Sequence, residues 1–305
     1  MRDAGVIGCG VMGRNHVRVY SELKEVGTTY VFDLDTKSAE EVAAYTGAEV
    51  CSSIEELLRK VDLVSLAVPT RFHFETAQQV IGSGVHTLIE KPICGTAAEA
   101  EQLIQEIPDG IVVGVGHIER FNPIVPEIRK IATAPQYIAF HRHNPASGRI
   151  TDASIVEDLM IHDIDILFNA FFPDKEYSFS ARGNGDIALV LGSVDTTSFY
   201  LSASRKSAKK IRSIYIEEED RTIEGDFMTQ EIFVYRKPET YDQTNGLYRQ
   251  ENIIEKVLVN KVEPLKVELQ AFVRAAHDGR PFDVTPEQGL LNLRICEAIQ
   301  RETSR

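Results

Sequence analysis

The sequence predicts an α/β protein with an N-terminal doubly wound Rossmann domain and a C-terminal α+β domain whose sheet is open and mostly antiparallel. Residues 1 to 117 alternate short apolar β-type runs with helical patterns, whereas consecutive β-type runs dominate the chain after about residue 122. A chain of 305 residues is also long for a single core. We therefore predict two domains, one at 1–119 and one at 120–305.

The N-terminal part has the rhythm of a parallel sheet. Its β-type runs are continuously apolar, as strands buried on both faces are, and helical patterns separate them. Ser52 and Glu55 form a capping-box pattern that opens a further helix. Strands alternating with helices imply a parallel, doubly wound sheet. The runs lie at 4–8, 28–33, 61–68, 85–90 and 110–116, and the helical patterns at 36–46, 72–82 and 96–107.

The C-terminal part is organised differently. A helix, a strand and a longer apolar helix are followed by β-type runs in series, which indicates an antiparallel or mixed open sheet. The polar segment 236–250 has the composition of a loop, and two helices close the chain. The helices are predicted at 123–132, 154–171, 263–278 and 285–303, and the strands at 137–143, 177–183, 186–192, 196–204, 210–218, 221–227 and 230–236.

Composition and charge exclude several classes of protein. A net charge of −13 argues against nucleic-acid binding, because phosphate contacts require an excess of Lys and Arg. No apolar run approaches the roughly 18 residues of a membrane helix, and the N-terminus has no signal-peptide pattern. The four cysteines are scattered without a CxxC pair, which argues against a zinc knuckle or a disulfide framework. We expect a reduced, cytoplasmic protein without a metal site.

The stretch "GVIGCGVMGRNH" contains a G-x-G-x-x-G spacing directly after a β-type run and at the start of a helix. In this motif the first glycine permits a tight turn, the second lets a pyrophosphate approach the backbone, and the third lets helix pack against strand. The free N–H groups of the helix N-terminus then bind the diphosphate. The predicted cofactor-binding residues of this loop are Gly8, Gly10, Val11, Met12 and Gly13.

An acidic residue completes the dinucleotide motif. Asp33 ends the β-type run 28–33 and lies twenty positions after Gly13, as the motif requires. Its carboxylate can accept hydrogen bonds from the adenosine ribose and would repel a 2′-phosphate. We therefore predict NAD as the cofactor. Lys37, close behind, keeps the use of NADP possible.

The helix 154–171 carries a polar stripe, which we define as Asp158, His162, Asp165 and Asn169. At roughly 100° per residue, steps of four, three and four place these side chains on one narrow face. A face in water would normally carry Lys, Glu or Arg, and this one carries none. Either the stripe lines a pocket that faces the cofactor, or the helix is simply half-exposed. Asp165 and Asn169 could support a site or merely solvate the helix.

Five motifs occur in a fixed order: the glycine loop, "VPTRFH" (68–73), "EKP" (90–92), "GHIERFNP" (116–123) and "DLMIHDIDIL" (158–167). With these motifs the chain resembles the Gfo/Idh/MocA family of NAD(P)-dependent sugar and inositol dehydrogenases. The resemblance covers essentially the full length, including the closing "VTPEQGLLNLRICEAIQ". It implies a Rossmann domain and an α+β domain whose open sheet commonly forms the subunit interface, hence a homodimer or homotetramer.

The resemblance also implies catalytic roles. Lys91 of "EKP" matches the lysine that contacts the reacting hydroxyl, and Asp158 and His162 match the family's Asp-x-x-x-His pair on the helix that faces the nicotinamide. Many members have Gly where this chain has Met160, so we expect altered packing there. Our hypothesis makes His162 the general base, Lys91 the electrostatic partner and Asp158 the residue that orients the imidazole. The same three side chains would contact the substrate.

Further residues are candidates for the cofactor site. Val68, Pro69 and Thr70 open "VPTRFH", and Glu90 and Lys91 open "EKP"; all are expected near the cofactor, because ligands of open α/β sheets lie at the carboxyl ends of strands. His73 resembles a family position near the nicotinamide. A capping role at the following helix is its alternative.

Four polar residues are candidates for binding substrate. Arg120 and Asn122 suit a phosphate or hydroxyls, although an arginine there could instead tie the two domains together. The segment 141–149 could be a flexible loop over the substrate with Arg142 and Arg149 as anion ligands, or a solvated connection. The basic run 205–212 is predicted to be the solvated turn of a hairpin.

The resemblance implies oxidation of a secondary hydroxyl of a sugar by hydride transfer, and we expect C3 of a UDP-linked N-acetylhexosamine. The alternatives are a dehydrogenase of a free sugar or inositol and, from a different class, a non-catalytic NAD-sensing regulator. A regulator would be expected to lose the lysine or the Asp–His pair. This chain keeps Lys91, Asp158 and His162.

Overall fold

The computed structural model describes residues 1–145, 154–237, 241–244, 247–250 and 253–303. The chain forms two compact units. Unit 1 comprises Met1–Phe121 and Glu263–Arg294, and unit 2 comprises Asn122–Val262 and Ile295–Arg305.

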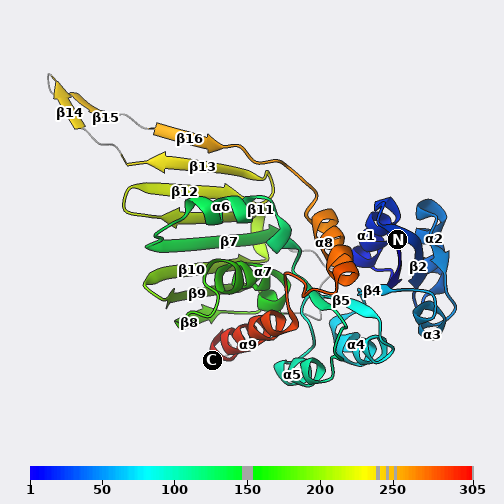
Figure 1. The fold of residues 1–305 in the computed structure, drawn as a ribbon. Coiled ribbons are helices and arrows are strands. Elements are labelled where there is room, and N and C mark those ends of the chain that lie inside the picture. The colour runs from blue at the N-terminus through cyan, green and yellow to red at the C-terminus, as the bar shows by residue number, and fades with distance from the viewer. Residues whose placement is uncertain (146–153, 238–240, 245–246, 251–252, 304–305) are drawn as a thin grey trace. The chain divides into compact units, whose positions relative to one another are not determined.

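The strands of unit 1 form one parallel sheet in the order β3-β2-β1-β4-β5-β6 (Figure 1). Each β-type run predicted in this part of the chain is a strand, and all residues of β4 are buried, as expected for a strand covered on both faces. The doubly wound sheet is therefore confirmed. The strands are β1 (Arg2–Ile7), β2 (Val26–Phe32), β3 (Glu49–Val50), β4 (Leu63–Leu66), β5 (His86–Glu90) and β6 (Val113–Gly116).

Helices connect these strands, and one predicted helix start is displaced. The N-cap of α3 is Ser53, whose side chain accepts a hydrogen bond from the N–H of Glu56 at 3.1 Å. The capping pair predicted at Ser52 and Glu55 is therefore wrong by one residue, because both serines satisfy the same spacing rule. The helices are α1 (Val11–Glu22), α2 (Thr36–Thr46), α3 (Ile54–Leu58), α4 (His73–Gly82) and α5 (Ala97–Gln105), with 3₁₀ turns η1 (Thr70–Phe72) and η2 (Ile118–Phe121).

The chain returns to unit 1 near its end, through α8 (Pro264–Asp278) and the first part of α9 (Pro286–Thr303). Leu269 and Phe272 of α8 are fully buried in the core of this unit, and each contributes about 1.5–3 kcal/mol by its burial. The prediction that everything after residue 119 belongs to the second domain is therefore wrong for 263–294. The apolar face of α8 was visible in the sequence, but the core against which it packs was not.

The main sheet of unit 2 has the order β16-β13-β12-β11-β7-β10-β9-β8. Strands β7 and β10 pair in parallel, and the other neighbouring pairs are antiparallel. The predicted open, mostly antiparallel sheet is confirmed. Its strands are β7 (Tyr137–Pro145), β8 (Tyr177–Gly183), β9 (Ile187–Val194), β10 (Thr197–Ser204), β11 (Lys206–Glu217), β12 (Arg221–Asp226), β13 (Glu231–Arg236) and β16 (Ile253–Val257).

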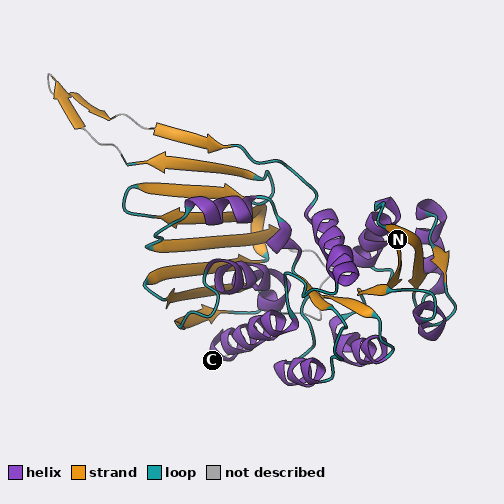
Figure 2. Ribbon diagram, viewed as in Figure 1, coloured by secondary structure: helices purple, strands orange, loops and turns teal. Residues whose placement is uncertain are grey.

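This sheet has one covered and one exposed face. Along β9, Ala188 and Val190 are buried, whereas the alternating residues Leu189 and Leu191 are 36% and 63% exposed. Helix α6 (Ile124–Ile131) lies against β12 and β13 on the covered face (Figure 2). The period of two along a strand thus separates core side chains from an apolar outer surface.

The segment 236–250 contains a hairpin where the sequence predicted a loop. Strands β14 (Tyr241–Thr244) and β15 (Leu247–Gln250) pair with each other in an antiparallel manner. These two strands form a sheet of their own, separate from the main sheet of unit 2. Their sequence therefore need not have the alternating apolar pattern of a strand that packs on a core. Strand β16 was also missed. It lies at the edge of the sheet, where Ile253 and Ile254 remain half-exposed.

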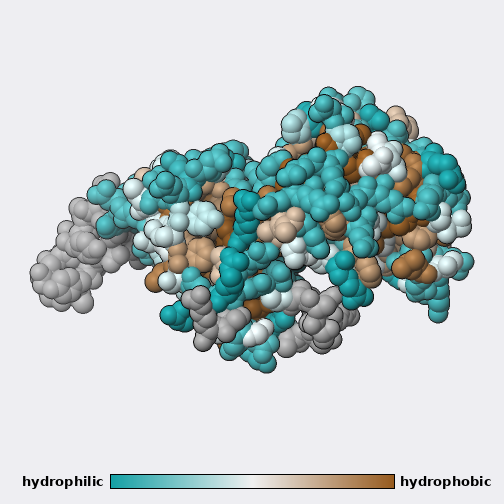
Figure 3. All heavy atoms as spheres, turned by 90° about the horizontal axis from the view of Figure 1, so that it is seen from below, coloured by the Kyte–Doolittle hydropathy of each residue, from teal (hydrophilic) through white to brown (hydrophobic). Residues whose placement is uncertain are grey.

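The surface is mostly hydrophilic on the face shown in Figure 3, with hydrophobic residues in separate patches. This agrees with a charged content of 26%. No helix in the described part of the chain is sufficiently long and apolar to cross a bilayer.

Candidate active site

The glycine loop between β1 and α1 has the geometry of a dinucleotide site. Gly8 has a φ of +97°, and a Cβ on it would lie 2.6 Å from the carbonyl oxygen of Ala67. A Cβ on Gly13 would lie 1.8 Å from the oxygen of Gly8. A Cβ on Gly10 would meet no atom within 4 Å, so this backbone faces open space. The loop therefore fits a pyrophosphate at the N-terminus of α1.

The neighbouring carboxylate is held in place by backbone N–H groups. Asp33, directly after β2, accepts from the N–H of Cys9 at 2.6 Å and from the N–H of Asp35 at 2.8 Å. A carboxylate has about four lone-pair sites, so it keeps capacity for ribose hydroxyls. Leu34, 90% exposed, adds an apolar surface suited to an adenine ring. Leu34 was not among the residues predicted from the sequence, although an apolar residue directly after the acidic one was a usable signal.

The other predicted cofactor residues of the first loops lie at strand ends. Val11, the first residue of α1, is 68% exposed, and Met12 beside it is partly buried. Val68, Pro69 and Thr70 follow β4 and lead into α4 without being fully buried. These positions lie at the carboxyl ends of adjacent parallel strands, where open α/β sheets bind ligands.

His73 plays a different part from the one predicted. Its ring is 1% exposed, with Nδ1 2.8 Å from the carbonyl oxygen of Pro92 and Nε2 2.9 Å from that of Val68. Burial lowers the pKa of the His73 imidazole, although hydrogen bonds to these carbonyls oppose the effect. The predicted cofactor contact is wrong for the ring nitrogens, because both are occupied by protein carbonyls. The ring instead joins the segments that follow β4 and β5.

Glu90 and Lys91 stand at the end of β5, and the Lys91–Pro92 peptide is cis. The carboxylate of Glu90 is directed inward: Oε1 lies 2.9 Å from Nε2 of His16, and Oε2 accepts from the N–H of Lys91 at 3.2 Å. Burial would raise the pKa of Glu90, but the bond to His16 and the charge of Lys91 bring it below its ordinary value. The predicted cofactor contact of Glu90 is thus replaced by an interior bond.

The polar stripe of unit 2 divides into two parts. Asp165 and Asn169 are 1% and 8% exposed, and Asn169 donates to Asp165 at 3.2 Å. The alternative that these two residues solvate the helix is therefore wrong. Asp158 and His162 keep partial exposure, although Nδ1 of His162 is shielded from solvent.

The helix that carries the polar stripe is not α-helical throughout. The segment consists of π-helical η3 (Val156–Met160), α7 (Ile161–Asp165) and π-helical η4 (Ile166–Phe171). The N–H of Ile161 bonds the carbonyl of Val156, and that of Phe172 bonds Leu167, five residues back in each case. The predicted stripe assumed α-helical spacing throughout, whereas the helix contains two π-helical turns. Asp165 and Asn169 nevertheless lie on the same face, because their side chains are 3.2 Å apart. Single π turns within helices occur frequently at functional sites.

Asp158 is paired with an arginine that the sequence analysis did not assign to the site. Nη2 of Arg205 lies 3.1 Å from Oδ2 of Asp158 and 3.4 Å from the carbonyl oxygen of Ser154. Arg205 precedes β11, which begins at Lys206. The basic run 205–212 is therefore mostly strand and not a solvated turn. Sequence distance hid this pair, since 47 positions separate its members.

A second ion pair lies under the helix. Nε and Nη2 of Arg142 are 2.9 and 2.7 Å from Oδ1 of Asp163, and both side chains are almost fully buried. The guanidinium also lies over the ring of Phe227 at 5.5 Å. Because β7 continues to Pro145, the predicted loop is a strand as far as that residue, and Arg149 lies outside the described residues. The prediction of Arg142 as an accessible substrate ligand is wrong, since Asp163 already holds it in the interior.

The two remaining substrate candidates differ in exposure. Arg120 lies in η2 and is partly exposed. Asn122 is 2% exposed; its Nδ2 donates to the carbonyl of Phe227 at 2.9 Å, and its Oδ1 accepts from the N–H of Ile124 at 3.3 Å. Substrate contact by Asn122 is therefore not supported, because its amide is used to fix the start of α6.

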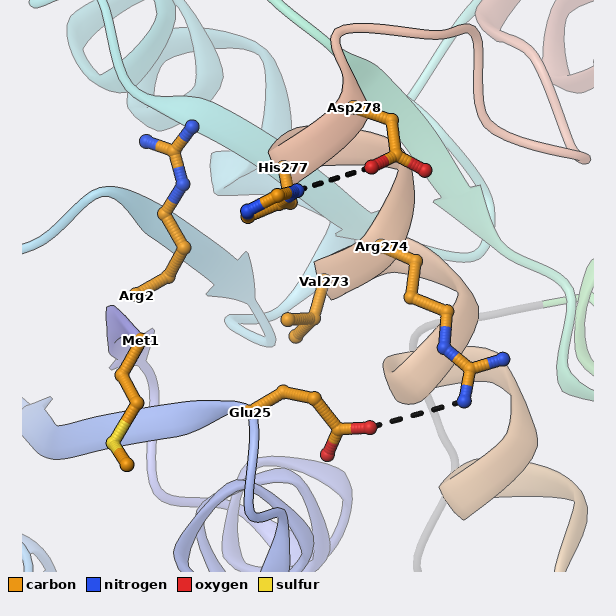
Figure 4. Close-up of a pocket in the computed structure, with 7 residues that line it drawn as sticks. All are labelled: Met1, Arg2, Glu25, Val273, Arg274, His277 and Asp278. Atoms are coloured by element: carbon orange, nitrogen blue, oxygen red, sulfur yellow. Dashed lines mark hydrogen bonds and ion pairs between the residues drawn. The ribbon is translucent and has the colours of Figure 1, made fainter.

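Unit 1 also contains a hollow of about 280 Å³ that lies away from the glycine loop (Figure 4). It borders Arg2 at the start of β1 and Glu25 just before β2, the amino ends of the strands. Its charges are paired locally, with His277 3.0 Å from Asp278 and Arg274 3.8 Å from Glu25. It is not the cofactor site, which belongs at the carboxyl ends. Among the described residues, no three His, Cys, Asp or Glu side chains are grouped to hold a metal ion.

The family model for Gfo/Idh/MocA proteins, an oxidoreductase family with an NAD-binding Rossmann fold, matches residues 2–120. UDP-N-acetylglucosamine 3-dehydrogenase from Acidithiobacillus ferrooxidans is 32% identical over 241 residues, which are 76% of this chain and 76% of that protein. The chain belongs to the Gfo/Idh/MocA family. A solved structure of the same Acidithiobacillus ferrooxidans enzyme matches with a TM-score of 0.85 and 29% identity, covering 99% of this chain and 97% of that one.

A second relative has a different substrate in its name. Inositol 2-dehydrogenase 2 from Saccharopolyspora erythraea is 30% identical over 176 residues, 54% of this chain and 52% of that protein. As a Gfo/Idh/MocA member, the protein is an NAD(P)-dependent oxidoreductase acting on CH–OH groups.

Proposed function

We propose that this Gfo/Idh/MocA protein is an NAD-dependent dehydrogenase that oxidises a secondary hydroxyl of a sugar, at C3 of a UDP-linked N-acetylhexosamine. The similarity to UDP-N-acetylglucosamine 3-dehydrogenase carries this proposal, because its structural match covers 99% of the chain and so includes both units. Lys91, Asp158 and His162, the three residues that the chemistry requires, are all present.

Each of these residues has a separate role in the proposed reaction. His162 removes the hydroxyl proton as the carbinol carbon loses hydride, and Asp158 stabilises the imidazolium that results. The ammonium group of Lys91 stabilises the negative charge that develops on the substrate oxygen. NAD, when bound, supplies the hydride acceptor. Arg205 keeps the carboxylate of Asp158 in place through the 3.1 Å ion pair.

The preference for NAD is assigned to Asp33. Its carboxylate stands beside the glycine loop, fixed by the N–H groups of Cys9 and Asp35. A fixed negative charge favours ribose hydroxyls and disfavours a 2′-phosphate. Lys37, four positions after Asp33, is exposed, and its positive charge would favour the 2′-phosphate of NADP.

An inositol dehydrogenase is the second candidate. It is supported by the 30% identity to inositol 2-dehydrogenase 2, but that similarity covers only 54% of the chain. A non-catalytic regulator is disfavoured, because such a protein has no need to keep the lysine and the Asp–His pair together.

The test is a substrate panel. The protein is incubated with NAD or NADP and with UDP-N-acetylglucosamine, UDP-N-acetylgalactosamine, UDP-glucose, free N-acetylglucosamine or myo-inositol, and formation of the reduced cofactor is followed. We expect turnover with a UDP-N-acetylhexosamine, and product analysis should place the ketone at C3. Turnover with myo-inositol alone would favour the second candidate, and no turnover with any compound would refute the substrate assignment.

We also propose that the protein is a cytoplasmic homodimer or homotetramer that associates through the exposed face of the unit 2 sheet. The exposed leucines of β9, Leu189 and Leu191, support an interface there, and the buried free cysteines suit a reducing compartment. Light scattering should give a multiple of 34.1 kDa. Leu191→Lys should reduce that mass, and an unchanged mass would place the interface elsewhere.

A further inference from the structure

A buried polar pair links helix α1, which follows the glycine loop, to the end of β5, next to Lys91, in unit 1. His16 lies in the second turn of α1 and is fully buried, and Glu90 ends β5 with 8% exposure. Nε2 of His16 is 2.9 Å from Oε1 of Glu90, although 74 positions separate them in the chain. Neither residue is required by the glycine motif, and the chemistry proposed above does not use His16.

The hydrogen bonds define the protonation of this pair. Nδ1 of His16 is buried without a hydrogen-bond partner. A buried N–H without an acceptor is rarer and less favourable than a buried lone pair, so the ring carries its proton on Nε2 and donates it to Glu90. The other oxygen of Glu90 accepts from the backbone N–H of Lys91 at 3.2 Å. With both oxygens accepting, Glu90 is a carboxylate.

The packing around the pair leaves it little freedom. Gly116 is opposite Glu90 in the β5–β6 register, and a Cβ on Gly116 would lie 3.2 Å from Cδ of Glu90. The ring of His16 meets that of Tyr20 edge to face, with centroids 6.5 Å apart. The hydroxyl of Tyr20 bonds Oγ of Ser65 at 2.7 Å. Ring and carboxylate are thus both fixed from several sides.

We infer that His16 is a positioning residue for the dehydrogenase reaction: its bond to Glu90 maintains a fixed anion beside Lys91, and this anion fixes the backbone of the lysine and places a negative charge near its side chain. The inference rests on the proposed function, since it acts through the role given to Lys91. It differs from a purely structural role, because His16 affects catalysis through the ionisation of Glu90.

The charges around the carboxylate give the expected sign of the pH effect. The titratable side chains that interact with Glu90 include His16, Lys91 and His73, and Tyr20 faces the ring of His16. Burial opposes ionisation of Glu90, and the hydrogen bond from His16 favours it. Without that bond, burial should raise the pKa of Glu90 toward the assay range. The carboxyl then takes up a proton as the pH falls, and Lys91 loses its neighbouring anion.

The kinetic experiment compares His16→Leu with His16→Gln, which keeps an N–H donor near the position of Nε2. With UDP-N-acetylglucosamine and NAD, kcat of His16→Leu should fall about tenfold at pH 6.5, and the acid limb of its pH profile should move up by about one unit. His16→Gln should restore most of kcat and the original limb. His277→Gln, an exposed histidine of the same unit, should match the unaltered protein. A uniform loss without a shift of the acid limb would show a structural role and overturn the inference.

Three further measurements make the result decisive. Glu90→Gln keeps the shape but removes the charge, so it should lower kcat at every pH; an unchanged kcat would overturn the inference even if His16→Leu does not fold. In ¹⁵N NMR spectra of the protein without added cofactor, His16 should show the neutral Nε2–H tautomer, assigned by its loss in His16→Gln. Protonation on Nδ1 would contradict the inference.

Lys91→Met separates the two proposals. Normal turnover in that variant refutes the function of Lys91, whereas an inactive Lys91→Met beside a normal His16→Leu refutes the role of His16 alone.

Discussion

Arg205 forms an ion pair with Asp158 at 3.1 Å, across 47 positions of the chain. Both side chains are mostly buried, at 17% and 13% exposure, so the pair is less screened than a surface ion pair. Arg205 also reaches the carbonyl oxygen of Ser154, which precedes η3. The carboxylate of Asp158, which is proposed to support His162, is therefore held in place by Arg205, a residue that lies between β10 and β11.

Removing this arginine should impair the proposed base. Arg205→Gln leaves the carboxylate of Asp158 without its cationic partner, and we expect kcat to fall by about 10-fold to 100-fold, as for the loss of a charged hydrogen bond. Arg205→Lys should retain more activity, because it keeps the charge. The matched control is Lys206→Gln, which removes the next residue's exposed ion pair with Asp186. Equal activities of Arg205→Gln and the control would show that the pair has no catalytic importance.

The assignment of His162 as general base makes a stronger prediction. His162→Ala should lower kcat by about 10²–10⁴-fold, the usual contribution of a positioned base. Binding of NAD, measured by calorimetry, should not change, because His162 lies in unit 2 and the glycine loop lies in unit 1. Near-normal turnover of His162→Ala would refute the assignment.

The buried pair of Arg142 and Asp163 should be important for stability. Arg142→Met leaves the carboxylate of Asp163 buried without this cation, and breaking a buried pair by removing one partner typically costs about 3–5 kcal/mol in the free energy of unfolding. Urea unfolding would measure the change. Lys130→Met, which removes the exposed pair with Glu127, should leave the unfolding midpoint almost unchanged. Similar midpoints for the two variants would contradict this account.

Most of the fold could be predicted from the sequence, because its strands and helices have regular local patterns of apolar residues. The apolar runs of unit 1 became buried parallel strands, and the alternating runs of unit 2 became a sheet with one exposed face. The predictions that were wrong concern segments whose position depends on contacts with residues far away in the chain. The sequence of residues 263–294 has the pattern of amphipathic helices, which does not indicate the unit on which they pack. The burial of Leu269 and Phe272 in the core of unit 1 shows that they belong to that unit.

The site was less predictable than the fold. The glycine spacing and Asp33 could be recognised because a dinucleotide imposes local geometry on consecutive residues. The partners of the polar groups could not, since His16–Glu90 and Arg205–Asp158 join segments far apart in the chain. The π-helical turns were also invisible, because a sequence pattern is judged against an α-helical period.

Cys9 and Cys94 should be unreactive in the folded protein. Burial, with the nearby charge of Asp33, raises the pKa of Cys9 to about 12, and burial raises the pKa of Cys94 to about 12. Because the thiolate is the nucleophile, iodoacetamide at pH 8 should alkylate these residues about 10³-fold more slowly in the native than in the unfolded protein. The folded pKa lies above the unfolded one, so this contribution to stability is present below about pH 9 and is lost as the pH rises toward 12. Rapid native alkylation of Cys94, detected by mass spectrometry, would contradict its burial in the folded protein.

Asp33 provides the test of cofactor preference. Asp33→Ser removes the carboxylate that accepts from Cys9 and faces the ribose position, and it should raise KM for NAD by about 10-fold to 100-fold, the range of one or two charged hydrogen bonds. It should affect KM for NADP much less, because the repulsion of the 2′-phosphate disappears with the charge. Asp35→Ser is the matched control, since Asp35 is exposed and its side chain bonds Ser38 within α2. A preference for NADP in the unaltered protein, or equal losses with both cofactors in Asp33→Ser, would mean that another group selects the dinucleotide.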